Sequence, residues 1–219
     1  DFHTDEHMVK PRLVYISNST ELGTVYGRKE LEDLRRFCLE RGLLLFVDGA
    51  RLGSALSVPG CGLDLPGMAD LSDAFYIGGT KNGALIGEAL VISTPCLKED
   101  FRFHLKQRGA MLAKGRLLGI QFAELFRDGL YFDLAMHANR MADRLREAIV
   151  ETGHPFLVDS PSNQIFPIFP DRLIGDLQED FDFHVWSKVD EGRSSIRLVT
   201  SWATREESVE AFIGKLKKH

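Results

Sequence analysis

The sequence has few cysteines and no excess of positive charge. Three cysteines occur in 219 residues, and neither their number nor their spacing fits a disulfide framework or a metal site. Reduced thiols of this kind are typical of a reducing compartment, so we expect a cytoplasmic protein. The formal net charge is −5, which argues against nucleic acid as a partner, because phosphate binding needs a basic surface. The seven histidines show no HExxH or comparable ligand spacing, so we expect no metal.

Long apolar runs are absent as well. No stretch approaches the ~20 residues of a transmembrane helix, and we expect no association with a membrane. The opening residues, DFHTDEHMVK, are acidic and lack the apolar core of a signal peptide. The hydrophobic content of 44% is enough for a sizeable core in one large or two small domains.

The first half of the chain reads as an α/β layer. Apolar or β-rich runs predict strands at 12–17, 43–47, 74–77 and 89–93, and apolar spacing predicts a helix at 29–40. The run LLLFV at 43–47 suggests a strand buried on both faces. A loop rich in proline and glycine is expected between residues 59 and 67. We expect a mostly parallel sheet, with 89–93 as its candidate antiparallel strand.

The second half reads as an α+β layer. Helix formers dominate from about Leu97 to Thr152, with one helix expected to start near Gly109 and another near Tyr131. Short strands follow at 156–158, 164–169, 183–187 and 195–200, with helices at 173–179 and 205–218. We divide the chain into residues 1–115, part of a large α/β domain, and residues 116–219, a smaller α+β domain.

An aspartate and a lysine follow two of the predicted strands. Asp48 ends the run LFVD, and Lys81 comes after YIGGT. Ligands of open α/β sheets bind beyond the carboxyl ends of strands, so neighbouring strands would bring this acid and this amine to one crevice. Taken singly, an Asp before Gly is typical of a turn or a helix cap, and a Lys in a glycine-rich turn is usually solvated. Together they match the needs of pyridoxal phosphate, which uses a lysine for its Schiff base and an acid to keep its pyridine nitrogen protonated.

Four segments carry a resemblance to a known family. FVDGARLGSAL and YIGGTKNGALIGEALVIS, preceded by YISNSTELGTVYG and followed by SIRLVTSW, resemble the low-specificity threonine aldolase / β-eliminating lyase family of fold-type I pyridoxal phosphate enzymes. The resemblance covers nearly all of the chain. It implies the C-terminal part of a fold-type I transferase large domain plus a smaller α+β C-terminal domain. It also implies that roughly the first third of a family member, with most of the phosphate-binding loop, is absent.

The resemblance implies a lyase that cleaves the Cα–Cβ bond of a β-hydroxy amino acid to give glycine and an aldehyde. Its partner would be a small amino-acid substrate, and its assembly a homodimer or homotetramer. Two alternatives stay open. The same scaffold supports β-elimination or transamination, because a fold does not fix a reaction. Alternatively, the chain is a non-catalytic remnant that keeps the C-terminal domain for dimerisation.

Roles within the site also follow from the resemblance. Lys81 would form the Schiff base with pyridoxal 5′-phosphate, and Asp48 would hold the pyridine nitrogen. Arg51 would bind the amino-acid carboxylate or the hydroxyl side of the ring. Arg197, in IRLVTSW, matches a second carboxylate-binding arginine, and a guanidinium fork suits a planar carboxylate. A surface charge on an edge strand is the alternative for Arg197.

Three further residues belong to this prediction. Thr20 matches the threonine of an Asn-Thr-His segment in the family, and Thr80 is a candidate contact for the cofactor phosphate. Glu21 stands where the family has a histidine near the substrate hydroxyl. A glutamate there could take a proton from a β-hydroxyl if its pKa suited that task, and the change puts threonine itself in question as the substrate.

Overall fold

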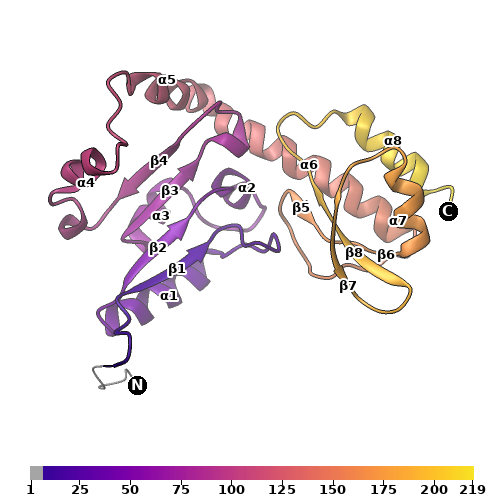
Figure 1. The fold of residues 1–219 in the computed structure, drawn as a ribbon, viewed down its shortest axis with the longest axis horizontal. Coiled ribbons are helices and arrows are strands. Elements are labelled where there is room, and N and C mark those ends of the chain that lie inside the picture. Colours follow the sequence, from indigo (N-terminus) through magenta and orange to yellow (C-terminus); the bar gives the residue numbers. More distant parts are fainter. Residues whose placement is uncertain (1–6) are drawn as a thin grey trace.

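The computed structural model describes residues 7–219, so residues 1–6 of the predicted 1–115 domain lie outside the described part. Figure 1 shows two sheets, each with its own helices, and a long helix, α6 (Leu130–Glu151), that runs from the first to the second.

The first sheet has the strand order β1-β2-β3-β4. Its strands are β1 (Leu13–Ser17), β2 (Leu44–Asp48), β3 (Ala74–Gly78) and β4 (Glu88–Ile92). The first three run parallel, and β4 pairs antiparallel with β3. This confirms the predicted sheet, including its single antiparallel strand, and it makes the strands that end at Asp48 and before Lys81 neighbours.

Strand β2 is buried on one face, so the prediction of burial on both faces is wrong. Leu45 and Val47 are fully buried, whereas the alternating residues Leu44, Phe46 and Asp48 are half-buried. Helices α1 (Arg28–Glu40) and α3 (Leu65–Leu71) contribute buried side chains to the core that contains Leu45 and Val47. On the other face, Tyr15 of β1 is 56% exposed, so in the described part of the chain this face meets solvent.

Helix α2 (Leu52–Leu56) precedes the predicted loop of residues 59–67, and the first residues of α3 lie within that loop. Pro66 does not prevent α3, because it lies in the first helical turn, where its missing N–H needs no partner. Asp64 caps this helix by accepting the Gly67 N–H at 2.8 Å. Of the prolines and glycines that predict a loop here, Pro66 and Gly67 instead belong to the first turn of α3.

Two short helices lie between β4 and α6: α4 (Phe101–Gln107) and α5 (Arg116–Leu125). The helix expected near Gly109 does not start there, because Gly109 has a φ of 70°, which suits a chain leaving a helix. Three 3₁₀ turns, η1 (Thr80–Asn82), η2 (Pro95–Leu97) and η3 (Arg127–Gly129), connect the elements. Helix α6 starts close to the predicted Tyr131, which is fully buried in the core of the first sheet.

The second sheet is antiparallel around β8 (Arg193–Val199). One side of β8 pairs with β5 (Gln164–Ile165) and β6 (Ile168–Pro170), and the other pairs with β7 (His184–Lys188). Helices α7 (Asp171–Gln178) and α8 (Glu206–Leu216) enclose a second core with α6. The division after residue 115 stays a prediction.

Two strand predictions for this half are wrong in detail. The segment 156–158 makes only a single bridge, between Phe156 and Pro167. The segment 164–169 is divided into β5 and β6, with Phe166 and Pro167 between them. Pro167 has no N–H for a ladder hydrogen bond, which accounts for the break.

Candidate active site

Asp48 is the last residue of β2, and its carboxylate is held by neighbours on both sides. Oδ1 accepts the Ala50 N–H at 3.0 Å, and Oδ2 accepts a hydrogen bond from the Tyr15 hydroxyl. Burial raises the pKa of this carboxyl. Hydrogen bonds from Tyr15 and Tyr76, together with the positive charge of Lys81, outweigh that effect and hold the pKa of Asp48 below its ordinary value. Asp48 is therefore an anion at neutral pH.

Lys81 lies in the turn η1, shortly after β3. The turn ends at Gly83, whose φ of 103° favours glycine. Within residues 7–219 the Lys81 amine has no hydrogen-bond or ion-pair partner. Partial burial lowers the pKa of Lys81, and the positive charge of Arg51 lowers it further, against the opposing effect of Asp48 and other acids. The tight loop thus presents an unpaired amine that loses its proton more readily than a solvated lysine.

The chain just after β2 closely approaches the end of β3. The Gly78 N–H donates to the Gly49 carbonyl at 2.9 Å, and a Cβ on Gly78 would overlap the carbonyl of Ala50. The glycines therefore allow the two strand ends to meet without side chains between them. This contact brings Asp48 and Lys81 to the same edge of the sheet, as their positions after neighbouring strands predicted.

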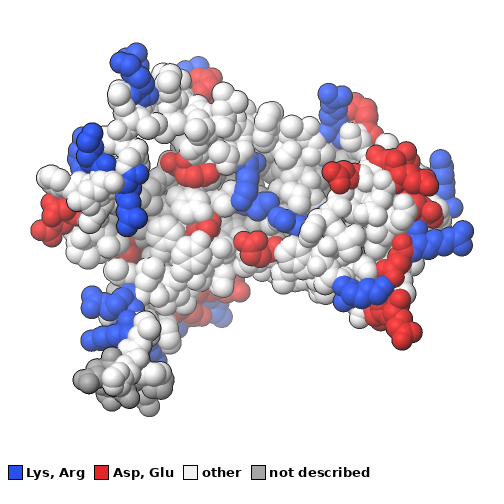
Figure 2. Space-filling view, in the orientation of Figure 1, with Lys and Arg blue, Asp and Glu red and all other residues white. Residues whose placement is uncertain are grey.

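Arg51, Glu21 and Arg197 come from three separate segments, and both Glu21 and Arg197 lie within electrostatic reach of Arg51. Arg51 is half-buried, and its guanidinium has no hydrogen-bond partner among the described residues. Burial lowers the pKa of Arg51, the charge of Arg197 lowers it further, and Glu21 opposes both. Figure 2 shows basic side chains gathered in the hollow between the two halves of the molecule, with acidic side chains beside them. Arg51 follows β2 of the first sheet, whereas Arg197 lies on β8 of the second, so this charge cluster combines residues of both halves.

Arg197 lies on β8, the central strand of the second sheet, so the alternative of a charge on an edge strand is wrong. Its Nε donates to Oε1 of Gln164 at 3.1 Å, and its Nη2 donates to the same oxygen. The guanidinium carbon is 5.8 Å from the centre of the Trp186 ring, within the range of a cation–π contact. Arg197 is therefore held in place by side chains of its own sheet.

The hydroxyls of Thr20 and Thr80 both have hydrogen-bond partners within the chain. The Thr20 hydroxyl is 2.7 Å from the hydroxyl of Thr24, in the loop that also carries Glu21. The Thr80 hydroxyl donates to Glu88 Oε1 at 3.1 Å, and Glu88 also accepts the Gly79 N–H at 2.6 Å. Glu88 thus already accepts the Thr80 O–H and the Gly79 N–H, the donors that a cofactor phosphate at this position would need. The structure gives no support to a phosphate contact there.

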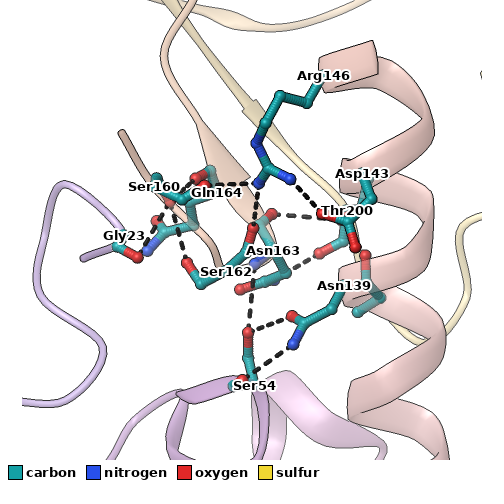
Figure 3. Close-up of polar contacts among 11 residues, drawn as sticks. Gly23, Ser54, Asn139, Asp143, Arg146, Ser160, Ser162, Asn163, Gln164 and Thr200 are labelled. Atoms are coloured by element: carbon teal, nitrogen blue, oxygen red, sulfur yellow. Dashed lines mark hydrogen bonds and ion pairs between the residues drawn. The ribbon is translucent and has the colours of Figure 1, made fainter. Parts of the chain in front are cut away.

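A buried polar network between the two sheets was missed by sequence reasoning (Figure 3). The Ser54 hydroxyl donates to Asn139 Oδ1 at 2.6 Å and accepts the Asn163 N–H at 3.2 Å. Asn163 Nδ2 in turn donates to the Thr200 carbonyl at 2.6 Å. The segment SPSNQ resembles an exposed turn in the sequence, because local composition does not distinguish a solvated polar run from a buried one.

Asn163 also lines a small cavity of about 10 Å³ together with Arg51 and Lys81. Its Oδ1 is buried and has no hydrogen-bond partner. A buried acceptor without a partner carries a desolvation cost, so it marks a place where a donor from a bound molecule or water would be stabilised. This acceptor lies beside the candidate site.

In residues 7–219 no group of histidine, cysteine and acidic side chains is arranged to hold a metal ion. Over the same range no helix has both the length and the apolar character needed to cross a bilayer. The three cysteines are free, and Cys38 and Cys61 are buried.

Comparison with known proteins shows the family to which this chain belongs. A family model described as beta-eliminating lyase matches residues 2–168. A low specificity L-threonine aldolase from Pseudomonas sp. (strain NCIMB 10558) is 32% identical over 216 residues, which cover 97% of this chain and 61% of the relative. The chain thus spans about three fifths of the length of that relative.

Solved structures agree with the sequence match. A threonine aldolase from Leishmania major superposes with a TM-score of 0.95 at 49% identity, over 98% of this chain and 63% of that one. Serine palmitoyltransferase from Sphingomonas wittichii gives a TM-score of 0.69 at 15% identity, over 95% of this chain and 54% of that one. At that identity the second match concerns the fold alone.

Proposed function

Because the chain belongs to the beta-eliminating lyase family and has the fold of fold-type I pyridoxal phosphate enzymes, we propose that the protein is an aldehyde-lyase that depends on this cofactor. It would cleave the Cα–Cβ bond of a β-hydroxy amino acid and release glycine and an aldehyde. One observation carries the proposal: Asp48 and the unpaired Lys81 lie at one sheet edge, with Arg51 and Arg197 beside them. The names of the similar proteins support the same reaction class.

The donor set fits pyridoxal phosphate. The cofactor needs an amine for its aldehyde and a stable anion for its pyridine nitrogen. Lys81 offers an amine without a partner and with a lowered pKa, and Asp48 offers a carboxylate that its neighbours keep ionised. When bound, pyridoxal phosphate supplies an electron sink for the electrons released as a bond at Cα breaks. Asp48, Lys81 and the nearby Asn163 acceptor are the residues that we assign to holding it.

Each residue then has a defined task. Asp48 would hold the proton on the pyridine nitrogen through its charged carboxylate. Lys81 would anchor the cofactor covalently through Nζ, and its free amine would move a proton at Cα of the product. Arg197 would bind the substrate carboxylate with its planar guanidinium fork, and Arg51 would add positive charge on the same side. These assignments place the cation pair at the carboxylate end of the substrate.

Glu21 is assigned to the β-hydroxyl of the substrate. Its side chain is exposed, on the loop that includes Thr20 and Thr24, and its charge reaches both Lys81 and Arg51. A carboxylate there can accept the hydroxyl proton as the Cα–Cβ bond breaks. Thr20 would help to fix this loop through its bond to Thr24. Thr80 is not given a role, since Glu88 already accepts its hydrogen bond.

We also propose a homodimer or homotetramer. Large apolar side chains near the Lys81 turn support this part of the proposal, because soluble monomers rarely expose several of them together. Leu85 is 93% exposed, and Ile86, Leu117 and Ile120 are each at least 60% exposed. A self-associated protein would cover such residues.

Borohydride reduction tests the lysine assignment. The protein loaded with pyridoxal phosphate is reduced, digested and mapped by mass spectrometry, with Lys98 as an internal reference of similar exposure. We expect the label on Lys81. A label spread over other lysines would refute the assignment. Supplying β-hydroxy amino acids to the unreduced protein and measuring glycine and aldehyde tests the reaction, and absence of both products across the panel would refute the lyase proposal.

A further inference from the structure

Gln164 is a fully buried glutamine at the start of β5, and sequence reasoning assigned it no role. A long amide side chain in a core is costly unless its donor and acceptor atoms are satisfied. Its backbone pairs with Val199 of β8, which leaves the side-chain amide to find partners elsewhere. Those partners are two residues of the candidate site.

The acceptor end of Gln164 holds Arg197. Oε1 accepts the Arg197 Nε at 3.1 Å and also accepts its Nη2. A guanidinium has five N–H donors in a rigid plane, so this contact uses one edge and leaves the Nη1 end of the fork free. No other hydrogen bond fixes the Arg197 side chain within residues 7–219. The orientation of its free donors therefore depends on Gln164.

The donor end of Gln164 reaches the loop that carries Glu21. Nε2 lies 3.5 Å from the Thr20 carbonyl, the outer limit of a hydrogen bond. The adjoining Ser160 hydroxyl donates to the Gly23 carbonyl at 3.0 Å, and a Cβ on Gly23 would overlap that hydroxyl. Figure 3 shows Gln164, Ser160 and Gly23 side by side, with Arg146 reaching the same segment from α6. The loop is thus seated directly on the segment that contains Gln164.

We propose that Gln164 is a positioning residue that aims Arg197 at the substrate carboxylate and sets its distance from the Glu21 loop. The inference rests on the proposed function and adds a specificity determinant to it. Charge is central to this role. A neutral amide fixes the guanidinium and leaves its positive charge uncompensated, whereas a carboxylate in the same place would pair with Arg197 and compete with the carboxylate of the substrate.

The test compares two near-isosteric variants of the holoenzyme, Gln164→Glu and Gln164→Leu. Glycine, the proposed product, is titrated into protein loaded with pyridoxal phosphate, and its Kd is read from the absorbance of the bound cofactor. Glycinamide, which lacks the carboxylate, is titrated in parallel. Gln178→Glu is the matched control, because it makes the same change on the exposed face of α7.

We expect Gln164→Glu to weaken glycine binding by about tenfold or more, the size of a lost charged hydrogen bond, and Gln164→Leu to weaken it less. The Kd for glycinamide should stay unchanged in both variants, and Gln178→Glu should match the wild type for both ligands. A defect of folding would change both ligands equally and would overturn the positioning role. Wild-type glycine affinity in both variants would overturn the role of Gln164 alone. Absence of any glycine response in the wild-type holoenzyme would overturn the proposed function, and this inference with it.

Discussion

The substitution Asp48→Asn separates the charge of this residue from its hydrogen bonds. Asparagine can still accept the Ala50 N–H through Oδ1, and its amide can donate to the Tyr15 oxygen in place of the present bond. We therefore expect the stability to change by less than about 1 kcal/mol. What the substitution removes is the negative charge that would face the protonated pyridine nitrogen of the bound cofactor.

The size of the catalytic effect follows from that charge. Two unit charges about 4 Å apart interact by about 4 kcal/mol at an effective dielectric of about 20. Asp48 is half-buried at the open end of a strand, so solvent screening reduces this to about 2–3 kcal/mol. If all of this interaction energy is lost from the stabilisation of the transition state, kcat falls roughly 30- to 150-fold.

Steady-state release of glycine and aldehyde at saturating cofactor measures kcat, and urea denaturation measures stability. Asp64→Asn is the matched control. Asp64 also accepts a backbone N–H, that of Gly67, at 2.8 Å, but it caps α3 and has no place in the site, and asparagine caps as well as aspartate. The control should keep the wild-type kcat. Asp48→Asn with wild-type kcat at saturating cofactor would refute the role of the Asp48 charge.

Two further predictions concern Arg197 and Asp73. Arg197→Lys should raise KM roughly 5- to 150-fold with a smaller change in kcat, because an ammonium group cannot form the fork; an unchanged KM in steady-state kinetics would exclude carboxylate binding by Arg197. Asp73, 4% exposed, accepts bonds from Arg35 at 2.6 Å and from the Leu45 N–H at 2.7 Å, so Asp73→Asn should lower the free energy of unfolding by about 2–4 kcal/mol in urea at neutral pH. Burial raises the pKa of Asp73, but its hydrogen bonds hold the pKa below the ordinary 3.8, so its contribution is present above 3.8 and is lost as pH falls through the lowered value. The difference in the free energy of unfolding between the wild type and Asp73→Asn should therefore narrow as the pH falls through the lowered pKa. A difference that stays constant in acid would contradict this role of the Asp73 charge.

The site residues that sequence reasoning found are those placed by local patterns. Asp48 and Lys81 each follow an apolar run and precede glycines, and parallel strand ends meet at one sheet edge, so their proximity could be predicted. Gln164 could not. Its partners Thr20 and Arg197 are 144 and 33 residues away in sequence, and no periodicity relates such positions.

The errors in the fold prediction have a similar origin. A run such as LLLFV fits burial on one or both faces, because the sequence of a strand does not reveal which neighbours will cover it. In the same way, Pro66 is compatible with a loop or with the first turn of α3, and only the cap at Asp64 decides between them. Such choices depend on contacts that form after the local elements exist.

The charge arrangement of the site gives the two arginines a common explanation. Burial lowers the pKa of Arg51, and the nearby charge of Arg197 lowers it further, so the two cations repel each other. Among the described residues no carboxylate bonds to either guanidinium, and the side chain that holds Arg197 is the neutral amide of Gln164. Two cations kept together without a bonded anion lower their free energy when an external anion binds between them. In the proposed function the carboxylate of the amino-acid substrate is this anion, bound on the side of the site where Arg51 also lies within electrostatic reach of Lys81 and Glu21.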